Sequence, residues 1–504
     1  MPTRHWKSDG ASRTTATRSG PSSAVWSVFL LGAATSMSLP AQTLTTLHRF
    51  NVTNGEYAEG ALVQGTDGDF YGTTNEGGAN GVGTVFKITP GGVLTTLYSF
   101  CVQTACADGS FPAAGLVQAT NGTFYGTTGH GGAAINCPQG CGTVFKITAN
   151  GKLTTLHTFC SQACDDGAYP FGGLVQAANG ALYGSTVSTV FKITPAGGLT
   201  TLHTFNSAEG SNLSGLIQAT NGDFYGTAES GGAHGYGTVF KITPAGGVTT
   251  LYSFCSESGC PDGGSPVSAL VQATNADFYG TTPIGGIGSD YDCSSGGCGT
   301  VFSITPAGKL TTLYSFCTQN ACADGARPLG ALVQSTDGSL FGVTYEGGVS
   351  NPCPYVVYLY GCGTIFKITP AGALSTVYTF LGSTDGALPG AGLVQATNGN
   401  FYGTTGADGT TFGGSGTFFR LSVGLTAFVE THPTSGKVDT IVKILGNNLS
   451  GTTSVTFNGT AAVFKVVSSS EITATVPSGA STGMVQVVTP SSTLSSNVPF
   501  RVLP

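Results

Sequence analysis

The sequence predicts an all-β protein, namely a seven-bladed β-propeller followed by an immunoglobulin-like β-sandwich. Three observations support this. Gly makes up 79 of the 504 residues and charged residues only 9%, a composition typical of short strands joined by tight turns. One block recurs seven times at a spacing of 42 to 62 residues. After residue 422 the block gives way to shorter alternating strands.

Each repeat holds four short apolar runs, which read LVQ, FYGTT, GTVFKIT and TTLYSF in the first copy. The second run carries an aromatic before Gly at Tyr71, Tyr125, Tyr183, Tyr225, Tyr279, Phe341 and Tyr402. The third run has its Phe at Phe86, Phe145, Phe191, Phe240, Phe302, Phe366 and Phe418. A four-strand unit of this length is typical of a propeller blade, because solenoid rungs are shorter and separate sandwiches need more strands.

The fourth run is out of phase with the other three. Its first copy, Thr46–Phe50, precedes the first LVQ, and no copy follows the last third run at Gly416–Ser422. The sequence therefore predicts that residues 43–50 complete the last blade. Such closure would leave no open sheet edge between the ends of the repeat array.

The connections between strands differ in length according to the face they lie on. The first-to-second and third-to-fourth connections are tight turns, such as Thr66-Asp67-Gly68 and Thr89-Pro90-Gly91-Gly92. The other two connections are long and share the opposite face, where all fourteen cysteines fall. We call this the elaborated face, and we expect it to carry function because loops on a rigid scaffold often do.

The cysteines form seven close pairs, which predict local disulfides in an exported chain. The pairs are Cys101/Cys106, Cys137/Cys141, Cys160/Cys164, Cys255/Cys260, Cys293/Cys298, Cys317/Cys322 and Cys353/Cys362. Zinc is the alternative, but His partners at ligand spacing are missing. We therefore predict no metal site.

Residues 1–42 resemble a secretory leader, with a basic stretch, the apolar run Ala24–Leu39 and the small-residue site Pro40-Ala41-Gln42. A membrane anchor is the alternative, although the run is short for a span. No later run is long enough to cross a membrane, so we expect a secreted or cell-surface protein with no stable span. Without residues 1–42 the net charge falls from −7 to −10, from 14 basic and 24 acidic residues. This acidity disfavours nucleic acid and anionic lipid as partners.

The C-terminal part has a different pattern. Residues 423–430 are expected to be a linker, and residues 431–504 an immunoglobulin-like sandwich of six or seven short strands.

Two family resemblances follow from these strings. The repeats G-L-V-Q-A-T-N-G-x-F-Y-G-T-T and G-T-V-F-K-I-T-P are similar to the Gloeo/Verruco tandem repeat of bacterial exported proteins, over residues 43–421. The tail, with P-x-S-G, V-x-I-x-G-x-N-L and V-T-F-N-G, resembles the IPT/TIG domain. The first resemblance implies a propeller without a settled activity, and the second implies surface interaction or spacing.

The best binding candidates are three tyrosines in the longest loop, Tyr345–Gly363, namely Tyr355, Tyr358 and Tyr360. They could stack on sugar rings or meet a protein, and the alternative is packing over the neighbouring blade. A second candidate is a ring of Asp-Gly carboxylates near the channel mouth that binds a cation or sugar hydroxyls. It comprises Asp108, Asp166, Asp262, Asp324 and Asp385. Turn formation is the alternative for these residues.

No catalytic set is recognisable. The sequence holds no G-x-S-x-G and no H-E-x-x-H motif, and its Gly-Gly pairs lack the helix and Lys of a phosphate loop. We predict no cofactor and no catalytic residue. The leading hypothesis is an exported, non-catalytic protein that binds an extracellular polysaccharide or a surface protein through the elaborated face. The alternatives are a polysaccharide hydrolase or lyase that uses the Asp-Gly carboxylates, and a structural spacer.

Overall fold

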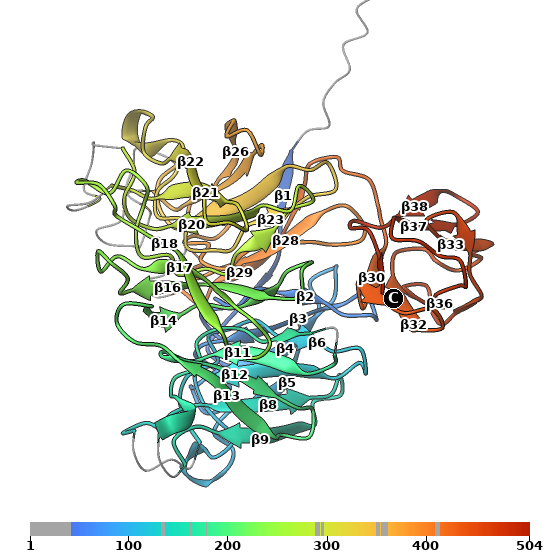
Figure 1. Cartoon of the computed structure of the whole chain (residues 1–504), viewed down its shortest axis with the longest axis horizontal. Coiled ribbons are helices and arrows are strands. Elements are labelled where there is room, and N and C mark those ends of the chain that lie inside the picture. The colour runs from blue at the N-terminus through green and yellow to red at the C-terminus, as the bar shows by residue number, and fades with distance from the viewer. Residues whose placement is uncertain are drawn as a thin grey trace, which may run out of the picture. The chain divides into compact units, whose positions relative to one another are not determined.

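The structure, a computed structural model, describes residues 42–132, 137–161, 164–177, 179–287, 293, 297–348, 353, 361–408 and 414–503. Their helical elements are three short 3-10 turns, η1 (Thr104–Cys106), η2 (Cys164–Asp166) and η3 (Asn320–Cys322). The other regular elements are strands (Figure 1), so the all-β prediction is confirmed.

Seven antiparallel sheets occupy residues 43–422, and we number them as blades one to seven by their innermost strands. The innermost strands are β2 (Val63–Gln64), β6 (Val117–Gln118), β10 (Val175–Gln176), β15 (Ile217–Gln218), β19 (Val271–Gln272), β23 (Val333–Gln334) and β27 (Val394–Gln395). The second strands are β3 (Phe70–Thr74), β7 (Phe124–Thr128), β11 (Leu182–Ser185), β16 (Phe224–Ser230), β20 (Phe278–Thr282), β24 (Leu340–Thr344) and β28 (Phe401–Thr405).

The third strands are β4 (Thr84–Ile88), β8 (Thr143–Ile147), β12 (Thr189–Ile193), β17 (Thr238–Ile242), β21 (Thr300–Ile304), β25 (Thr364–Ile368) and β29 (Thr417–Ser422). The outer strands are β5 (Leu94–Ser99), β9 (Leu153–Thr158), β13 (Leu199–Thr204), β18 (Val248–Ser253), β22 (Leu310–Ser315), β26 (Leu374–Thr379) and β1 (Thr43–Arg49). Blade four also carries β14 (Ser211–Leu213), which pairs with β16.

The second strand of each blade is buried on both faces, which explains its apolar run. In β3 all five residues are buried. A Cβ added at Gly72 would lie 2.6 Å from the ring of Phe86, so the repeated Gly makes room for the Phe of the third strand. In blade seven Gly403 lies opposite Phe419. Phe419, and not Phe418, is therefore the equivalent of Phe86, and the predicted register of this strand was wrong by one residue.

Neighbouring blades contact each other through aromatic rings. Tyr71 of blade one stacks on Phe124 of blade two, with ring centroids 4.0 Å apart. Tyr402 of blade seven meets Phe70 of blade one at 4.3 Å. The same contact therefore joins the last blade to the first.

A glutamine at the end of each inner strand also links neighbouring blades. The Oε1 atom of Gln118 accepts a hydrogen bond from the backbone N–H of Thr66 in the preceding blade, at 3.0 Å. Gln64 accepts the corresponding bond from Thr397 of blade seven, also at 3.0 Å. Six such bonds are present among the described residues.

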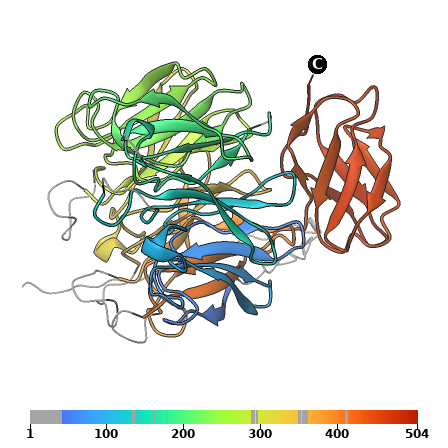
Figure 2. The ribbon, with the colours of Figure 1, turned by 90° about the horizontal axis from the view of Figure 1, so that it is seen from below.

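The N-terminal strand β1 lies at the outer edge of blade seven, where the repeat count places it. It pairs antiparallel with β29, from Thr43 opposite Ser422 to Arg49 opposite Thr417. Phe50 then packs edge-on against Phe86 of blade one, at 5.2 Å. The N-terminal repeat and the last repeat are thus neighbours, as the blue and orange strands in Figure 2 show.

The C-terminal residues form a separate sandwich core. One sheet has the order β30 (Glu430–His432), β32 (Ile441–Leu445), β36 (Glu471–Thr475) and β35 (Phe464–Val466). The other has the order β34 (Thr460–Ala461), β33 (Ser454–Phe457), β37 (Val485–Val488) and β38 (Thr493–Ser495). β31 (Ser435–Gly436) pairs with β39 (Arg501–Val502). Val429 belongs to this core, so the sandwich begins inside the expected linker 423–430.

Removing the closing strand should destabilise the propeller. A chain that starts at residue 51 exposes the edge of β29 and loses the Phe50–Phe86 contact. Loss of one buried Phe costs about 3–5 kcal/mol, so we expect a melting temperature roughly 10 °C or more below that of a chain starting at residue 42. Thermal unfolding followed by circular dichroism measures this. Equal melting temperatures for the two chains would contradict the proposed role of β1.

Candidate ligand site at the centre of the elaborated face

A cavity of about 620 Å³ lies where the segments leading into the inner strands of all seven blades meet. Gly and Ala make up 14 of the 27 residues in these segments, and their small side chains help to leave the centre open. The lining segments are Glu59–Val63, Ala113–Leu116, Phe171–Leu174, Asn212–Leu216, Val267–Ala269, Leu329–Ala331 and Gly390–Gly392. Tyr169, Val187 and Glu229 complete the lining. These segments belong to the long connections, so the cavity lies on the elaborated face.

One backbone position beside the cavity has the same unusual conformation in every repeat. It lies two residues after the Gly of the Asp-Gly turn, or after the matching Gly of blades one and four. Its φ lies between 53° and 59° in all seven copies, Tyr57, Phe111, Tyr169, Asn212, Ser265, Arg327 and Leu388. Residues other than Gly rarely adopt this left-handed region, and such outliers cluster at functional sites.

Hydrogen bonds between blades hold this conformation. The N–H of Tyr169 donates to the carbonyl of Cys141 in blade two, at 2.8 Å, and that of Asn212 donates to Val187 in blade three, at 2.7 Å. Six of the seven positions make such a bond to the preceding blade. The backbone is thus constant, while the side chain differs from blade to blade. This is the arrangement expected of a specificity-determining position.

Aromatic side chains form one wall of the site, where blades two and three meet. Tyr169 and Phe171 have nearly parallel rings, with an interplanar angle of 9° and centroids 6.2 Å apart. The His130 ring stands edge-on to both, at 5.3 and 6.1 Å, and Phe111 packs on its other side. Burial lowers the pKa of His130, so its ring is neutral at physiological pH. Phe171 nevertheless remains 47% exposed.

A polar pair lies next to this wall. The Asn212 side-chain amide donates to the Glu229 carboxylate at 3.1 Å, and both residues line the cavity. Between this pair and the aromatic wall lies Val187, in the shortest second-to-third-strand loop of the chain. The short loop of blade three therefore leaves this side of the cavity uncovered.

On the side of blades six, seven and one, Glu59 lines the cavity, and Tyr345, Glu346 and Arg327 lie outside the lining. Burial raises the pKa of Tyr345, and the negative charges of Glu59 and Glu346 raise it further. Burial also raises the pKa of Glu59, and a hydrogen bond from Asn75 offsets this only in part. Glu59 is exposed to the cavity, yet surrounding protein atoms displace enough water to disfavour its charge. Arg327 on this side is paired with Glu346 at 2.9 Å.

The Asp-Gly carboxylates do not form the expected ring at the channel mouth. None of the five lines the central cavity. Each accepts a hydrogen bond from a Tyr or His of the preceding outer strand and from its own loop backbone. Asp108, for example, accepts from the Tyr98 hydroxyl at 2.8 Å and from the N–H groups of Val102 and Gln103. The bonds of the others are equivalent, for Asp166, Asp262, Asp324 and Asp385.

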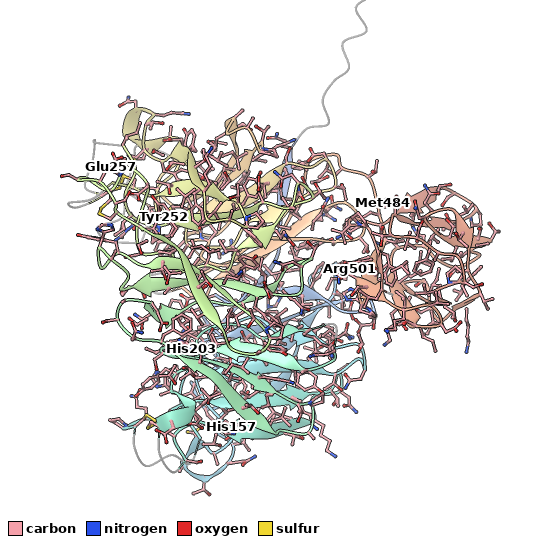
Figure 3. All side chains as sticks on the ribbon, in the orientation of Figure 1. His157, His203, Tyr252, Glu257, Met484 and Arg501 are labelled. Atoms are coloured by element: carbon pink, nitrogen blue, oxygen red, sulfur yellow. A yellow bond between two sulfur atoms is a disulfide. The ribbon has the colours of Figure 1, made fainter. Side chains whose placement is uncertain are left out.

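Histidine replaces the outer-strand Tyr in blades two, three and seven. His157 contacts Asp166 at 2.8 Å, and His203 contacts Glu209 at 3.0 Å. Both residues lie on outer strands, β9 and β13 (Figure 3), away from the residues that line the cavity. Their geometry is that of loop-anchoring side chains.

All seven predicted disulfides are present. They join Cys101–Cys106, Cys137–Cys141, Cys160–Cys164, Cys255–Cys260, Cys293–Cys298, Cys317–Cys322 and Cys353–Cys362. Sulfur atoms of neighbouring disulfides come close together, as in the group Cys298, Cys317 and Cys322. Because every cysteine is paired, the zinc alternative has no thiolate to use.

The blade-six tyrosines Tyr355, Tyr358 and Tyr360 lie outside the described residues, and their proposed binding role stays a prediction. The aromatic wall and the left-handed position were not predicted from the sequence. One signal was available. In the stretch from the Asp-Gly turn to the inner strand, the second residue after Gly is aromatic in the first three repeats and Asn, Ser, Arg and Leu in the others.

The fold and the cavity define a repeat β-propeller joined to an immunoglobulin-like domain. The Gloeobacter/Verrucomicrobia repeat model matches residues 30–189 and 186–419, and the chain belongs to this family. The IPT/TIG domain model matches residues 428–502. No curated protein matches the chain.

Solved structures share the fold. A streptogramin B lyase is 15% identical with a TM-score of 0.51, and the match covers 77% of this chain and 99% of that one. Virginiamycin B lyase from Staphylococcus aureus is 14% identical with a TM-score of 0.51, covering 76% and 99%. At these identities the likeness concerns the propeller alone.

Replacing Glu59 should show how much its ionised carboxylate destabilises the folded state. Because the folded state raises the pKa of Glu59, its contribution to stability is present only at low pH and is lost as the pH rises through that pKa. We expect Glu59→Gln to melt at a higher temperature than the native chain at about pH 7, and to match it below about pH 4. Thermal unfolding at both pH values measures this. A Glu59→Gln variant that is less stable at neutral pH would show that the carboxylate has a stabilising partner.

Proposed function

We propose that this protein is an exported binding protein that engages an extracellular polysaccharide or a surface protein at the central cavity of its elaborated face. One observation carries the proposal. The left-handed backbone position recurs in all seven repeats with six different side chains, and two of its copies, Tyr169 and Asn212, line the cavity.

The geometry suits recognition by a preorganised surface. The left-handed positions are held by hydrogen bonds to the neighbouring blade, and four of the seven disulfides close the long crossover loops that lead to them. A ligand would then meet side chains that are already in place, which reduces the ordering cost of binding. The aromatic wall offers apolar contact, and the polar pair offers hydrogen bonds.

Export is part of the proposal. Seven disulfides indicate an oxidising compartment such as the bacterial periplasm or exterior. Among the described residues, no helix is long and apolar enough to cross a membrane. We infer that residues 1–42 are a leader that is removed.

Filling the cavity should abolish binding. Ala113 lines the cavity and is partly exposed, so Ala113→Trp places an indole in the opening. Val102 is 67% exposed on a loop of the same face but does not line the cavity, so Val102→Trp is the matched control. We expect at least tenfold weaker retention of Ala113→Trp on immobilised cellulose, mannan, chitin or cell-envelope protein, and unchanged retention of the control.

Other results would place the binding site elsewhere or argue against a binding function. If Tyr355/Tyr358/Tyr360→Ala abolishes retention and Ala113→Trp does not, the ligand lies on the blade-six loop. If neither the native chain nor the variants are retained by any of these materials, the structural-spacer alternative is favoured.

A polysaccharide hydrolase or lyase is the second candidate function. Its proposed catalytic residue is Glu59 and no longer the Asp-Gly carboxylates. The Asp-Gly carboxylates are tied into their own loops, but Glu59 lines the cavity with a raised pKa, as a general acid requires. Release of new reducing or unsaturated ends from a retained polysaccharide, lost in Glu59→Gln, would favour this candidate. Retention without any product favours the binding function.

Leader removal makes a simple spectroscopic prediction. Both tryptophans, Trp6 and Trp26, lie in residues 1–42. The mature protein should therefore emit only tyrosine fluorescence, and N-terminal sequencing should begin near residue 42. Tryptophan emission from the exported protein would contradict cleavage at this place.

A further inference from the structure

We infer that the Tyr169–Phe171 wall and the Asn212–Glu229 pair form a subsite for a neutral, hydroxyl-rich sugar ring. The inference rests on the proposed function, because it names the ligand class of the same cavity. It assigns the subsite to blades two to four, and not to the long blade-six loop.

The two rings form an apolar platform in which Phe171 is exposed and Tyr169 is partly buried. Tyr169 and Phe171 are two residues apart, their ring planes differ by 9°, and both line the cavity. Their centroid separation of 6.2 Å is comparable to the length of one sugar ring. Pyranose rings carry C–H groups on their faces, and these groups pack on aromatic faces as other apolar surfaces do.

The platform is built into the fold. The left-handed backbone of Tyr169 is fixed by its bond to Cys141, and His130 supports both rings from the side. Phe171 lies over the blade-two loop at Gly129, where an added Cβ would come within 2.5 Å of the Phe171 ring. The exposure of Phe171, at 47%, is therefore imposed by its surroundings and does not result from a loose loop.

The polar pair next to the platform supplies directional groups. The Asn212 amide already donates one hydrogen bond to Glu229, which leaves its carbonyl oxygen and second N–H for a ligand. The Glu229 carboxylate can accept further bonds from hydroxyl groups. Vicinal hydroxyls at the edge of a stacked ring would meet both residues. The short loop at Val187 leaves access between the platform and the pair.

The charges of the lining exclude anionic sugars. The charged residues that line the cavity are Glu59 and Glu229, and the described lining holds no Lys or Arg. The nearby Arg327 is already paired with Glu346. A uronate polymer would therefore meet repulsion with no compensating cation.

A protein partner fits this site less well than a glycan. A stable protein interface needs about 800 Å² on each side, with a central apolar anchor. The apolar contact surface of the platform lies inside a concave cavity floored by Gly and Ala, where a narrow chain can enter.

The test uses isothermal titration of the full-length protein with four hexasaccharides, namely β-1,4-glucose, β-1,4-mannose, chitohexaose and hexagalacturonate. We expect at least one of the three uncharged probes to bind and hexagalacturonate not to bind. Tyr169→Ala/Phe171→Ala should weaken that binding about tenfold or more, and Asn212→Ala about fivefold. Tyr236, which is 44% exposed on the same face but outside the cavity lining, provides the control Tyr236→Ala with unchanged affinity.

Conservative variants guard against a folding artefact. Tyr169→Phe and Phe171→Tyr keep the rings and should retain affinity within about threefold. Failure of these two to bind, with melting temperatures unchanged, would overturn the stacking role.

The remaining outcomes separate the inference from the proposed function. Binding of hexagalacturonate alone overturns the inference. Binding of an uncharged probe that is lost in Ala113→Trp but kept in the platform variant also overturns it, while the cavity remains the binding site. If no probe binds but Ala113→Trp abolishes capture of a surface protein, the sugar class is wrong and the binding function stands. If Ala113→Trp changes no binding at all, both fail.

Discussion

Each repeat of this protein has two apolar faces that only its neighbours in the array can cover. Aromatic rings stack from blade to blade, and two sets of hydrogen bonds join the blades at opposite ends of the inner strands. One set runs from backbone N–H groups to the glutamines, and the other runs from the left-handed residues to the preceding blade. Because the last blade must contact the first, a change in the geometry of any repeat also changes the geometry of the closing contact. Strand β1 makes that closure.

The same constraint shapes the candidate site. The backbone of each left-handed residue is fixed by the neighbouring blade, so only its side chain is free to vary between copies. The array thereby presents Tyr, Phe, Asn, Ser, Arg and Leu at equivalent backbone positions, of which Tyr169 and Asn212 line the cavity. Chemical diversity on a constant frame is a general basis of recognition by repeat proteins. The aromatic wall includes one of these positions, Tyr169, whose neighbour Ala168 accepts a hydrogen bond from Val187 in the short loop of blade three.

The Asp-Gly carboxylates show how a repeated motif can suggest a site that does not exist. Five carboxylates at equivalent positions looked like a ring around the channel. In the structure each one accepts hydrogen bonds from an outer-strand hydroxyl or imidazole and from the backbone of its own loop. A buried carboxylate needs such donors, and the loop provides them locally. The repeated Asp therefore meets a structural requirement that recurs from blade to blade, whereas the residue two positions after the Gly varies and lines the cavity in two copies, Tyr169 and Asn212.

The sequence alone determined the strand order, the displaced closing strand and the local disulfides, because these follow from periodicity, counting and short spacing. It also indicated the elaborated face. It could not reveal the cavity wall, since His130, Tyr169, Asn212 and Glu229 come from four different segments that only blade packing brings together. Nor could it show that Phe171 stays exposed, because that depends on its close approach to Gly129 of another blade. The repeat pattern along the chain determined the strand order and the closure of the propeller, and contacts between blades determined which side chains meet at the cavity.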